Sequence, residues 1–301
     1  MTLKDFLSLV RFPTVFSSMS NAYAGWFIAG GRAPTATLGL GIAAAALFIM
    51  AGMALNDIAD RKVDAKERPR RPIPSGAVSL GVAWGASLLM LALGLAFLFL
   101  ANPVSIVPGV LLILAILAYN FLLKETALGP ASMGLCRLLN LLTGMSLVWT
   151  GWSDGFFLAD ASQGALLSLW TYITLVTYLA RDEVKGNSRL RARIFLAGMG
   201  VWFLAWAVHI GTAAGPGRGI PVLCMAAVWL GHVLFLLRPF RALAADPSPR
   251  HTGRTIGALL RAVPLADVLA MVAAGAPLVA ALPGILWILP AWLAGRLFYS
   301  T

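Results

Sequence analysis

The sequence predicts an all-α polytopic membrane protein. Of its 301 residues 59% are hydrophobic and 12% are charged, whereas about a quarter of the residues are charged in an ordinary soluble domain. No Asp, Glu, Lys or Arg occurs between Pro72 and Leu123 or between Ile194 and Gly217. A membrane-spanning helix needs about 20 consecutive apolar residues, so each stretch is long enough for at least one span. We expect one transmembrane domain over residues 1–301.

The apolar stretches divide into nine expected spans, preceded by a short interfacial segment at residues 2–14. The spans are expected at residues 15–31, 35–57, 79–101, 104–123, 132–152, 163–180, 194–213, 219–237 and 266–282. A last apolar piece, 284–298, follows Pro283-Gly284. It is either the outer half of a long, kinked ninth helix or a short tenth helix. The prediction is therefore nine transmembrane helices, or ten with this last piece.

Basic residues are distributed unevenly between the two sides of this topology. With the N-terminus in the cytoplasm, nineteen Lys and Arg residues fall on the inner side, and only Arg32 and Arg218 fall on the outer side. Inner loops of membrane proteins carry such an excess, so we predict an inner-membrane protein with a cytoplasmic N-terminus. The net charge of +11 then follows from topology. Membrane lipids and a diphosphate are the expected partners, and nucleic acid is not.

The second expected span ends in a polar run, Asn56-Asp57-Ile58-Ala59-Asp60-Arg61-Lys62-Val63-Asp64. A helix turns by about 100° per residue, so Asn56, Asp60 and Asp64 fall within an arc of about 80°, with Asp57 on its border. Carboxylate and amide oxygens on one face suit a hard cation such as Mg²⁺, which takes its other ligands from water and substrate phosphates. The sequence therefore predicts a metal site at the inner end of this span.

An Arg- and Pro-rich segment, residues 65–76, follows the acidic run. Its arginines suit a phosphate, and its prolines at 69, 72 and 74 end the helix and stiffen the loop. The alternative interpretation is a basic cytoplasmic loop that obeys the positive-inside rule and whose acids only aid solubility. That alternative does not account for carboxylates that share one face at a membrane boundary.

These motifs resemble those of the UbiA superfamily of intramembrane prenyltransferases. The resemblance rests on N-D-x-x-D-x-x-x-D followed by R-P-x-R-P-I-P-S-G. The run from Gly129 to Asn140 resembles a narrower branch, the EboC-like proteins, and the closing run from Arg296 to Thr301 is compatible with it. In length and helix order the resemblance covers the whole chain. It implies a helical bundle around a central cavity and one or two Mg²⁺ ions that bind an isoprenyl diphosphate.

A second acidic place lies at the inner end of the sixth span, in the run from Tyr178 to Gly186. Related prenyltransferases have two aspartates there with three residues between them, whereas this chain has only the adjacent pair Asp182-Glu183. Neighbours on a helix point about 100° apart, so both cannot face one ion squarely. A solvated helix end beside Arg181 is the alternative. By resemblance the metal ligands are Asn56, Asp57, Asp60, Asp64, Asp182 and Glu183, with Asp60, Asp64 and Asp182 catalytic.

Basic residues near these helix ends are implied by the resemblance to bind the diphosphate. They are Arg11, Arg61, Arg68, Arg71, Lys124 and Arg181. Arg11 is alternatively an anchor at the membrane interface. Lys124 forms with Tyr119 a pair like the one that relatives place near the diphosphate, although the spacing is one residue longer than usual. An interfacial tyrosine with a lysine that reaches to water is the alternative.

Polar residues inside the spans predict the wall of the cavity. Arg137 is costly within a span unless it is paired or faces a polar cavity, and Asn140 lies within one turn of it. Asn21 either lines the same cavity or makes a hydrogen bond between helices. With Tyr119, these residues are expected to line the cavity or to contact the acceptor.

The resemblance implies a transferase. It would move a prenyl group from an isoprenyl diphosphate to an unidentified acceptor by ionisation to an allylic cation, in a Mg²⁺-dependent reaction. The alternative is a UbiA-like protein whose catalysis is weak or lost and which binds or transports a polyprenyl or other phosphorylated lipid or metabolite. The reduced second acidic place favours that alternative, so the sequence leaves both functions open.

Overall fold

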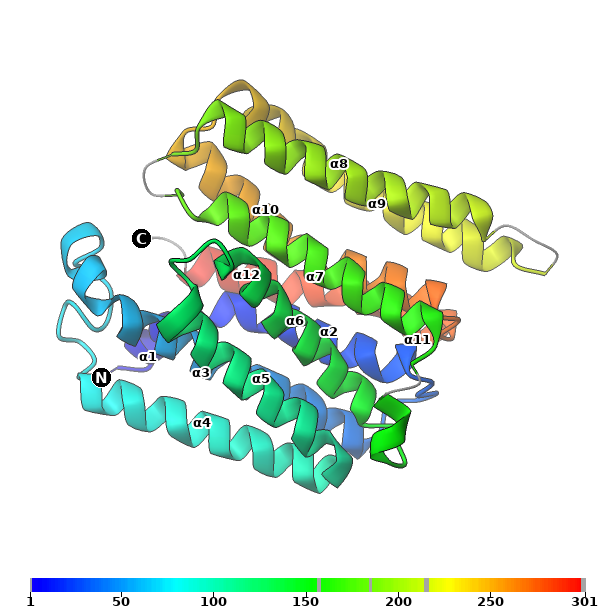
Figure 1. The fold of residues 1–301 in the computed structure, drawn as a ribbon, viewed down its shortest axis with the longest axis horizontal. Coiled ribbons are helices and arrows are strands. Elements are labelled where there is room, and N and C mark those ends of the chain that lie inside the picture. The colour runs from blue at the N-terminus through cyan, green and yellow to red at the C-terminus, as the bar shows by residue number, and fades with distance from the viewer. Residues whose placement is uncertain (1, 156–157, 184–185, 214–216, 299–301) are drawn as a thin grey trace.

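The computed structural model describes the chain except residues 1, 156–157, 184–185, 214–216 and 299–301, and Figure 1 shows its fold. The described residues form helices joined by turns, with no strand among them. The helices are α1 (Leu3–Leu9), α2 (Val15–Ile28), α3 (Ala36–Glu67), α4 (Leu80–Ala101), α5 (Ile106–Ala118), α6 (Gly129–Ser146), α7 (Asp160–Ala180), α8 (Arg189–Thr212), α9 (Gly219–Ala245), α10 (Pro249–Ala273), α11 (Leu278–Ala281) and α12 (Ile288–Phe298). Short 3₁₀ turns lie at Phe12–Thr14, Pro103–Ser105, Trp152–Gly155 and Leu282–Trp287, and a π-helical turn lies at Tyr119–Leu123.

The long helices run roughly side by side, with α4 at one edge of the bundle and the α8–α9 hairpin at the other (Figure 1). Between these edges, α2 packs on α3, α6 and α10, and α7 packs on α6 and α10. α10 is mostly buried, whereas α8 and α9 expose many apolar side chains. Exposed leucines and valines on an outer helix suit contact with lipid. The core of the bundle therefore lies around α2, α6, α7 and α10.

Seven helical segments are long and apolar enough to cross a membrane in the part of the chain that the structure describes. They are Ala36–Glu67, Leu80–Ala101, Pro103–Leu123, Arg189–Thr212, Gly219–Ala245, Pro249–Ala273 and Leu278–Gly295. α2, α6 and α7 overlap three further expected spans but are shorter or more polar. The chain is thus a many-helix membrane protein, and the count of nine spans stays a prediction.

The expected ninth span, 266–282, is wrong in both of its bounds. α10 begins at Pro249 and ends at Ala273, and Gly275, with a φ of 80°, turns the chain before α11. Charged and hydroxyl side chains in the first half of α10 interrupted the apolar run on which the prediction rested. Thr255 is nevertheless buried, because its hydroxyl donates to the carbonyl of His251 at 2.8 Å within the helix. The last apolar piece, 284–298, is therefore separate from α10.

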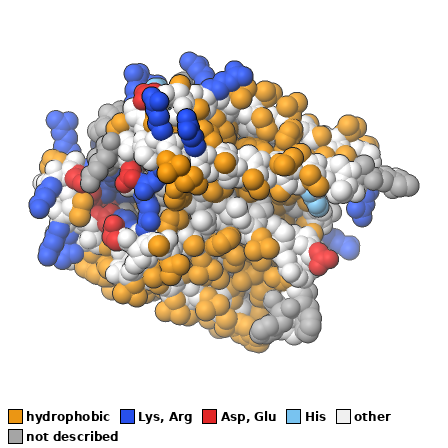
Figure 2. Space-filling model, turned by 45° about the horizontal axis from the view of Figure 1, so that its top comes forward, with side chains coloured by type: hydrophobic (Ala, Val, Ile, Leu, Met, Phe, Trp, Pro, Cys, Tyr) orange, Lys and Arg blue, Asp and Glu red, His pale blue; other side chains and the backbone are white. Residues whose placement is uncertain are grey.

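Charged side chains gather at one end of the bundle (Figure 2), here called the charged end. It is formed by the C-terminal ends of α3, α5, α7 and α9 and by the N-terminal ends of α1, α4, α6, α8 and α10 (Figure 1). α1 begins there with a capping box, in which the Thr2 backbone N–H donates to Asp5 Oδ2 at 2.7 Å. These donors hold the pKa of Asp5 below its ordinary value. Apolar side chains cover most of the rest of the face shown in Figure 2.

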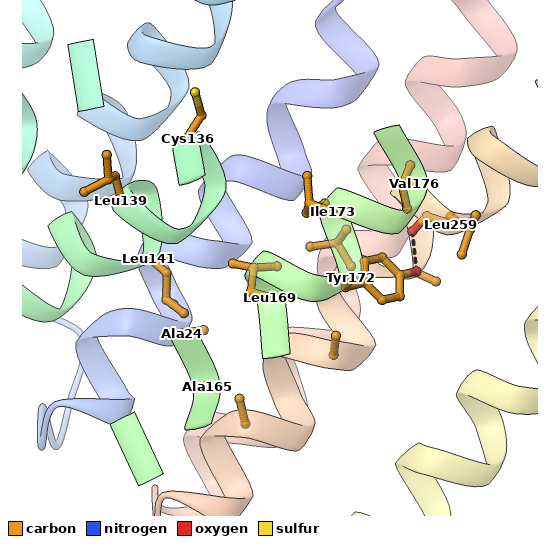
Figure 3. Packing of buried hydrophobic residues seen from close by; sticks show 14 of the residues in the cluster. Ala24, Cys136, Leu139, Leu141, Ala165, Leu169, Tyr172, Ile173, Val176 and Leu259 are labelled. Carbon is orange, nitrogen blue, oxygen red and sulfur yellow. Dashed lines mark hydrogen bonds between the residues drawn. The ribbon is translucent and has the colours of Figure 1, made fainter. Parts of the chain in front are cut away.

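Close packing fixes the central helices against one another. Leu141, Leu169 and Ile173 lie in the core between them (Figure 3), where the Tyr172 hydroxyl donates to the carbonyl of Leu259 at 2.9 Å. α2 and α6 approach so closely that a Cβ on Gly144 would lie 2.4 Å from the carbonyl oxygen of Ala22. Small residues permit such backbone contact between membrane helices. This contact fixes the distance between α2 and α6.

Replacing Gly144 by alanine should push α2 and α6 apart. Overpacking of this kind costs about 1–3 kcal/mol, so we expect a lower apparent Tm for the purified protein in detergent. Gly85→Ala is the matched control, because Gly85 is exposed on α4 and a Cβ there meets nothing within 4 Å. Equal melting of the two variants would contradict the close approach.

Candidate active site

A cavity of about 710 Å³ opens at the charged end among α2, α3, α5, α6 and α7. Oxygen-bearing side chains of the two acidic places line it together. They are Asn56, Asp60, Asp64, Glu67, Asp182 and Glu183. The inner ends of the second and sixth expected spans therefore lie at one shared cavity.

The face of α3 that carries the motif turns toward this cavity. α3 continues without a break through Glu67, so Asn56, Asp60 and Asp64 all line the cavity. Asp57 does not line it, and only 2% of this residue is exposed. From the sequence, Asp57 lies on the border of the arc that contains Asn56, Asp60 and Asp64. In the structure it lies outside the face of α3 that lines the cavity. Asp57 thus does not line the cavity, and its role as a metal ligand stays a prediction that this position does not support.

Asp57 instead lies between two arginines. Its Oδ1 accepts hydrogen bonds from Arg11 at 2.9 Å and from Arg71 at 3.2 Å. Arg71 also donates to Asp64 Oδ2 at 2.6 Å, so one guanidinium joins the buried and the cavity-lining aspartate. This ion-pair network connects the N-terminal segment, α3 and the loop after α3.

Arg11 has an unusual backbone conformation where α1 ends. Its φ of 47° and ψ of 55° put a non-glycine residue in the left-handed region, which costs about 1–3 kcal/mol. The turn brings its guanidinium to α3, where Nη2 donates to Asn56 Oδ1 at 3.2 Å as well as to Asp57. These charge-assisted bonds offset the strain. Arg11 is thus placed at the cavity rather than left as an interface anchor.

The long spacing between Tyr119 and Lys124 has a structural explanation. The backbone N–H of Lys124 bonds to the carbonyl of Tyr119 at 3.0 Å, so the extra residue is absorbed in a π-helical turn. Such turns occur often at functional sites. Lys124 forms an ion pair with Asp60, and Tyr119 lines the cavity beside it. Asn120, in the same turn, accepts a hydrogen bond from Asn56 Nδ2 at 3.0 Å and so orients the motif.

The second acidic place divides its two side chains between different neighbours. Asp182 forms an ion pair with Arg191 of α8, and 43% of its side chain is exposed. Glu183 lies against α10, with Oε1 3.0 Å from the point where a Cβ on Gly253 would be. Both line the cavity. Val184 and Lys185 of this run, like the closing residues 299–301, lie outside the described residues.

The basic residues predicted to bind diphosphate do not all reach the cavity. Those that line it are Arg11, Arg68, Arg71, Lys124 and Arg181. Arg181 donates to the backbone carbonyls of Lys124 and Thr126 and so fastens α7 to the turn before α6. Arg61 is exposed, donates to the carbonyl of Ile58 and does not line the cavity. The diphosphate-binding role of Arg61 therefore stays a prediction that this position does not support.

A buried polar network backs the cavity between α2, α6 and α10, formed by Ser17, Ser20, Asn21, Arg137 and Asp267. Asn21 Nδ2 donates to Asp267 Oδ1 at 2.9 Å, while Asn21 Oδ1 accepts from Arg137 at 3.4 Å. Asn21 does not line the cavity, so the helix–helix alternative describes it. Arg137 and Asn140 do line the cavity. The sequence reading overlooked Asp267, although a lone acid inside an apolar segment is a signal of function.

The donor set suits Mg²⁺ although it is small. The described residues contain no ready-made group of three or more His, Cys, Asp or Glu side chains that could hold a metal ion. Mg²⁺ does not require one, because it binds through one or two carboxylates and completes its octahedron with waters and substrate phosphates. Asn56, Asp60 and Asp64 offer hard oxygen ligands on one cavity wall. They fit a shared Mg²⁺–phosphate site better than a closed protein cage.

The model of the UbiA prenyltransferase family matches residues 18–245. The chain belongs to the UbiA prenyltransferase family. A structure of a UbiA homologue from Aeropyrum pernix K1 matches this family member with a TM-score of 0.65 and 17% identity, over 85% of this chain and 96% of that one. A UbiA homologue from Archaeoglobus fulgidus bound to GPP and Mg²⁺ matches with a TM-score of 0.62 and 16% identity, over 88% and 99%.

Among curated relatives, the digeranylgeranylglyceryl phosphate synthase of Sulfolobus acidocaldarius is 29% identical over 187 residues, 62% of this chain and 64% of that protein. The synthase of Haloquadratum walsbyi is 33% identical over 124 residues, 41% of this chain and 43% of that protein. The matched part thus spans less than two thirds of these relatives. The narrower EboC-like resemblance is not confirmed by them and stays a prediction.

The role of Asp57 can be tested through stability. Asp57→Asn should lower the free energy of unfolding by about 2–4 kcal/mol, because it removes the partner of two partly buried arginines. Asp60→Asn should cost less, since the Asp60 side chain is 23% exposed and loses one partner. Melting of both purified variants in detergent measures the difference. A smaller loss for Asp57→Asn than for Asp60→Asn would contradict the structural role.

Proposed function

We propose that this UbiA family member transfers a prenyl group from an isoprenyl diphosphate to a second substrate within the membrane, in a Mg²⁺-dependent reaction. The observation that carries the proposal is the single cavity that joins the acidic face of α3, the Asp182-Glu183 pair and a set of basic side chains. The relatives support it, since they include digeranylgeranylglyceryl phosphate synthases and UbiA homologues whose structures are bound to GPP or DMAPP with Mg²⁺.

The cation would be held by Asn56, Asp60 and Asp64, with Asp182 or Glu183 contributing to a first or second ion. When bound, Mg²⁺ neutralises the negative charge that builds on the diphosphate as its bond to the prenyl carbon breaks. The adjacent acids favour one well-coordinated ion over two. Asp57 is left out of this ligand set because it does not line the cavity.

Two basic side chains in the cavity are paired with acids of the motif and could pair with phosphate instead. Lys124 now pairs with Asp60, and Arg71 pairs with Asp64. If Asp60 and Asp64 held a metal ion, Lys124 and Arg71 would be free to bind phosphate oxygens, next to Arg11 and Arg68. Arginine and lysine bind phosphate through charge-assisted hydrogen bonds. The same basic side chains thus neutralise the acids first and the diphosphate afterwards.

An apolar wall continues from the acidic mouth along α3 and α5. It is lined by Phe48, Ile49, Met53, Leu112 and Ile116. Phe48 lies twelve residues before Asp60 on α3, or about 18 Å along the helix axis at 1.5 Å per residue. This wall would hold the prenyl chain and exclude water, which would otherwise capture the allylic cation.

The orientation in the membrane is part of the proposal. Most Lys and Arg residues lie at the charged end, so this end faces the cytoplasm of the inner membrane and admits the water-soluble diphosphate head. The basic loops also attract anionic membrane lipids.

A second candidate function is binding or transport of a polyprenyl or phosphorylated lipid without turnover. The observation in its favour is the ion pair between Asp182 and Arg191, which leaves the second acidic place with one fewer free carboxylate. Release of diphosphate distinguishes the two functions, because binding or transport alone releases none.

Asp60→Asn and Asp64→Asn should each reduce Mg²⁺-dependent diphosphate release from labelled prenyl diphosphates by at least about 100-fold. The loss follows from removing charge stabilisation in a cavity that excludes water. The assay uses purified protein in liposomes with a membrane lipid extract, and mass spectrometry detects the prenylated product.

Asp160→Asn is the matched control, since Asp160 is exposed at the start of α7, at the opposite end of the bundle. It should retain wild-type activity. An Asp60→Asn/Asp64→Asn double variant that still turns over the donor with Mg²⁺ would refute the prenyltransferase proposal. Wild-type protein that binds the donor but releases no diphosphate would favour the second candidate.

Phe48 should limit the length of the donor. It is 1% exposed, and its ring is pressed against α4, where a Cβ on Gly94 would come within 2.5 Å of Cε1. Phe48→Ala should raise the ratio of kcat/KM for geranylgeranyl over geranyl diphosphate by about tenfold or more, the scale on which pockets discriminate small apolar groups. Phe99→Ala, on the exposed face of α4, is the control and should leave the ratio unchanged. If the Phe48→Ala variant kept the wild-type ratio of kcat/KM values, the prenyl chain of the donor would not lie against Phe48.

A further inference from the structure

Arg191 reaches the cavity from the first turn of α8. This helix begins at the charged end, where the Ser188 hydroxyl caps it by accepting a hydrogen bond from the backbone N–H of Arg191 at 3.1 Å. The Arg191 side chain is 27% exposed, so it is neither sealed in the bundle nor fully surrounded by water. Arg191 thus brings a positive charge to the cavity from a helix of which no other described residue lines it.

Two neighbours at the end of α7 hold the Arg191 guanidinium in position. Its Nη1 forms an ion pair with Asp182 Oδ2. Its Cζ lies 5.6 Å from the centre of the Tyr178 ring, which is within the range of a cation–π contact. The carboxylate fixes one side of the planar group, and the aromatic ring supports its face. Neither contact uses all of the hydrogen-bond donors of the arginine.

The remaining donors of Arg191 are available to an anion in the cavity. A guanidinium has five N–H donors in a planar fork. Among the residues that the structure describes, Asp182 is the only one that pairs with this fork, and it does so through Nη1. The donors on Nε and Nη2 can therefore bind a phosphate oxygen while the ion pair with Asp182 persists. Arginine is suited to this because its fork matches the geometry of phosphate oxygens.

The same ion pair limits what Asp182 can do for a metal ion. A divalent cation at Asp182 would have to displace Arg191 or lie beside its positive charge. On α3, Asp60 and Asp64 share one face, so a metal ion gains several oxygen ligands in exchange for their basic partners. Asp182 offers a single carboxylate, because Glu183 lies against α10. The end of α7 is therefore a poorer metal site than α3.

We propose that Arg191 takes the place of a second metal ion, because it keeps Asp182 out of the metal site and itself donates to the diphosphate. The inference rests on the proposed function and adds a diphosphate-binding residue to it. One Mg²⁺ would bind on the α3 side of the cavity, and the diphosphate would meet Arg191 on the other side. The reduced second acidic place is then a change in how the diphosphate is bound and not a loss of function.

Binding of inorganic pyrophosphate tests the contact without turnover. Purified protein in non-ionic detergent with saturating Mg²⁺ is titrated calorimetrically with pyrophosphate. Arg191→Gln should weaken the affinity by about tenfold or more, because hydrogen bonds from a charged donor are lost. Arg191→Lys keeps the charge but loses the planar fork, so it should retain part of the affinity. Arg193→Gln is the matched control on the same helix, since Arg193 is exposed and does not line the cavity.

A double variant separates a direct contact from an effect through Asp182. Arg191→Gln alone leaves the Asp182 carboxylate without its partner, and this negative charge would repel pyrophosphate. In the Arg191→Gln/Asp182→Asn variant that charge is absent. The affinity should nevertheless stay about tenfold below that of the wild type, because Arg191 itself contacts the anion. Wild-type affinity in the double variant would overturn the proposal.

Binding of Mn²⁺ tests whether Asp182 holds a metal ion. Mn²⁺ binds to oxygen ligands as Mg²⁺ does, and its EPR signal counts the ions bound in the presence of pyrophosphate. Asp182→Asn should bind as many Mn²⁺ ions as the wild type, with an affinity within about twofold, whereas Asp60→Asn should weaken Mn²⁺ binding by at least about tenfold. Loss of one ion in Asp182→Asn would overturn the proposal. Such a failure is distinct from failure of the prenyltransferase assignment, which the Asp60 and Asp64 variants decide through diphosphate release.

Discussion

The structure depends on one buried carboxylate, Asp57, which pairs with Arg11 and Arg71. A carboxylate that is 2% exposed is costly without partners, and removal of either arginine would leave its charge partly uncompensated. The two arginines come from the segment before α2 and from the loop after α3. Their ion pairs with Asp57 hold both segments against α3. The Arg11 backbone accepts a left-handed conformation to reach it. The mouth of the cavity is therefore built around a residue that does not line it.

Much of the fold follows from hydropathy, because apolar runs with charged ends determine where helices cross a membrane. α4 and α9 begin within one residue of their expected starts. α10 was located poorly for a physical reason. Its first half is amphipathic and carries buried threonines whose hydroxyls bond to nearby carbonyls, so it does not read as apolar. A threonine whose hydroxyl bonds to a nearby carbonyl can be buried although it does not count as apolar in the sequence. The hydrophobic pattern therefore cannot show that such a residue is buried.

The parts of the candidate site that lie on one helix could be predicted from the sequence. The parts that depend on contacts between several helices could be predicted less well. The shared face of Asn56, Asp60 and Asp64 follows from helical geometry alone. The assignment of Asp57 required the position of Arg11, which is distant in sequence. The π-helical turn at Tyr119 could not be predicted from the spacing. In a regular α-helix the extra residue would rotate Lys124 away from Tyr119, whereas a π-helical turn absorbs that residue. Asp267 required knowledge that α2 and α10 pack together.

The charges that line the cavity explain how a charged cavity of this kind remains stable in a membrane. Among the described residues, six acidic and seven basic side chains line it, so its formal charge is close to zero before any ligand binds. A nearly neutral wall avoids most of the cost of placing charge in a medium of low dielectric constant. The proposed Mg²⁺ ion and diphosphate carry charges of opposite sign, so this balance would be kept on binding if Lys124 and Arg71 changed partners. The acidic and basic side chains of the cavity therefore balance one another's charge, and the role of either group depends on the other.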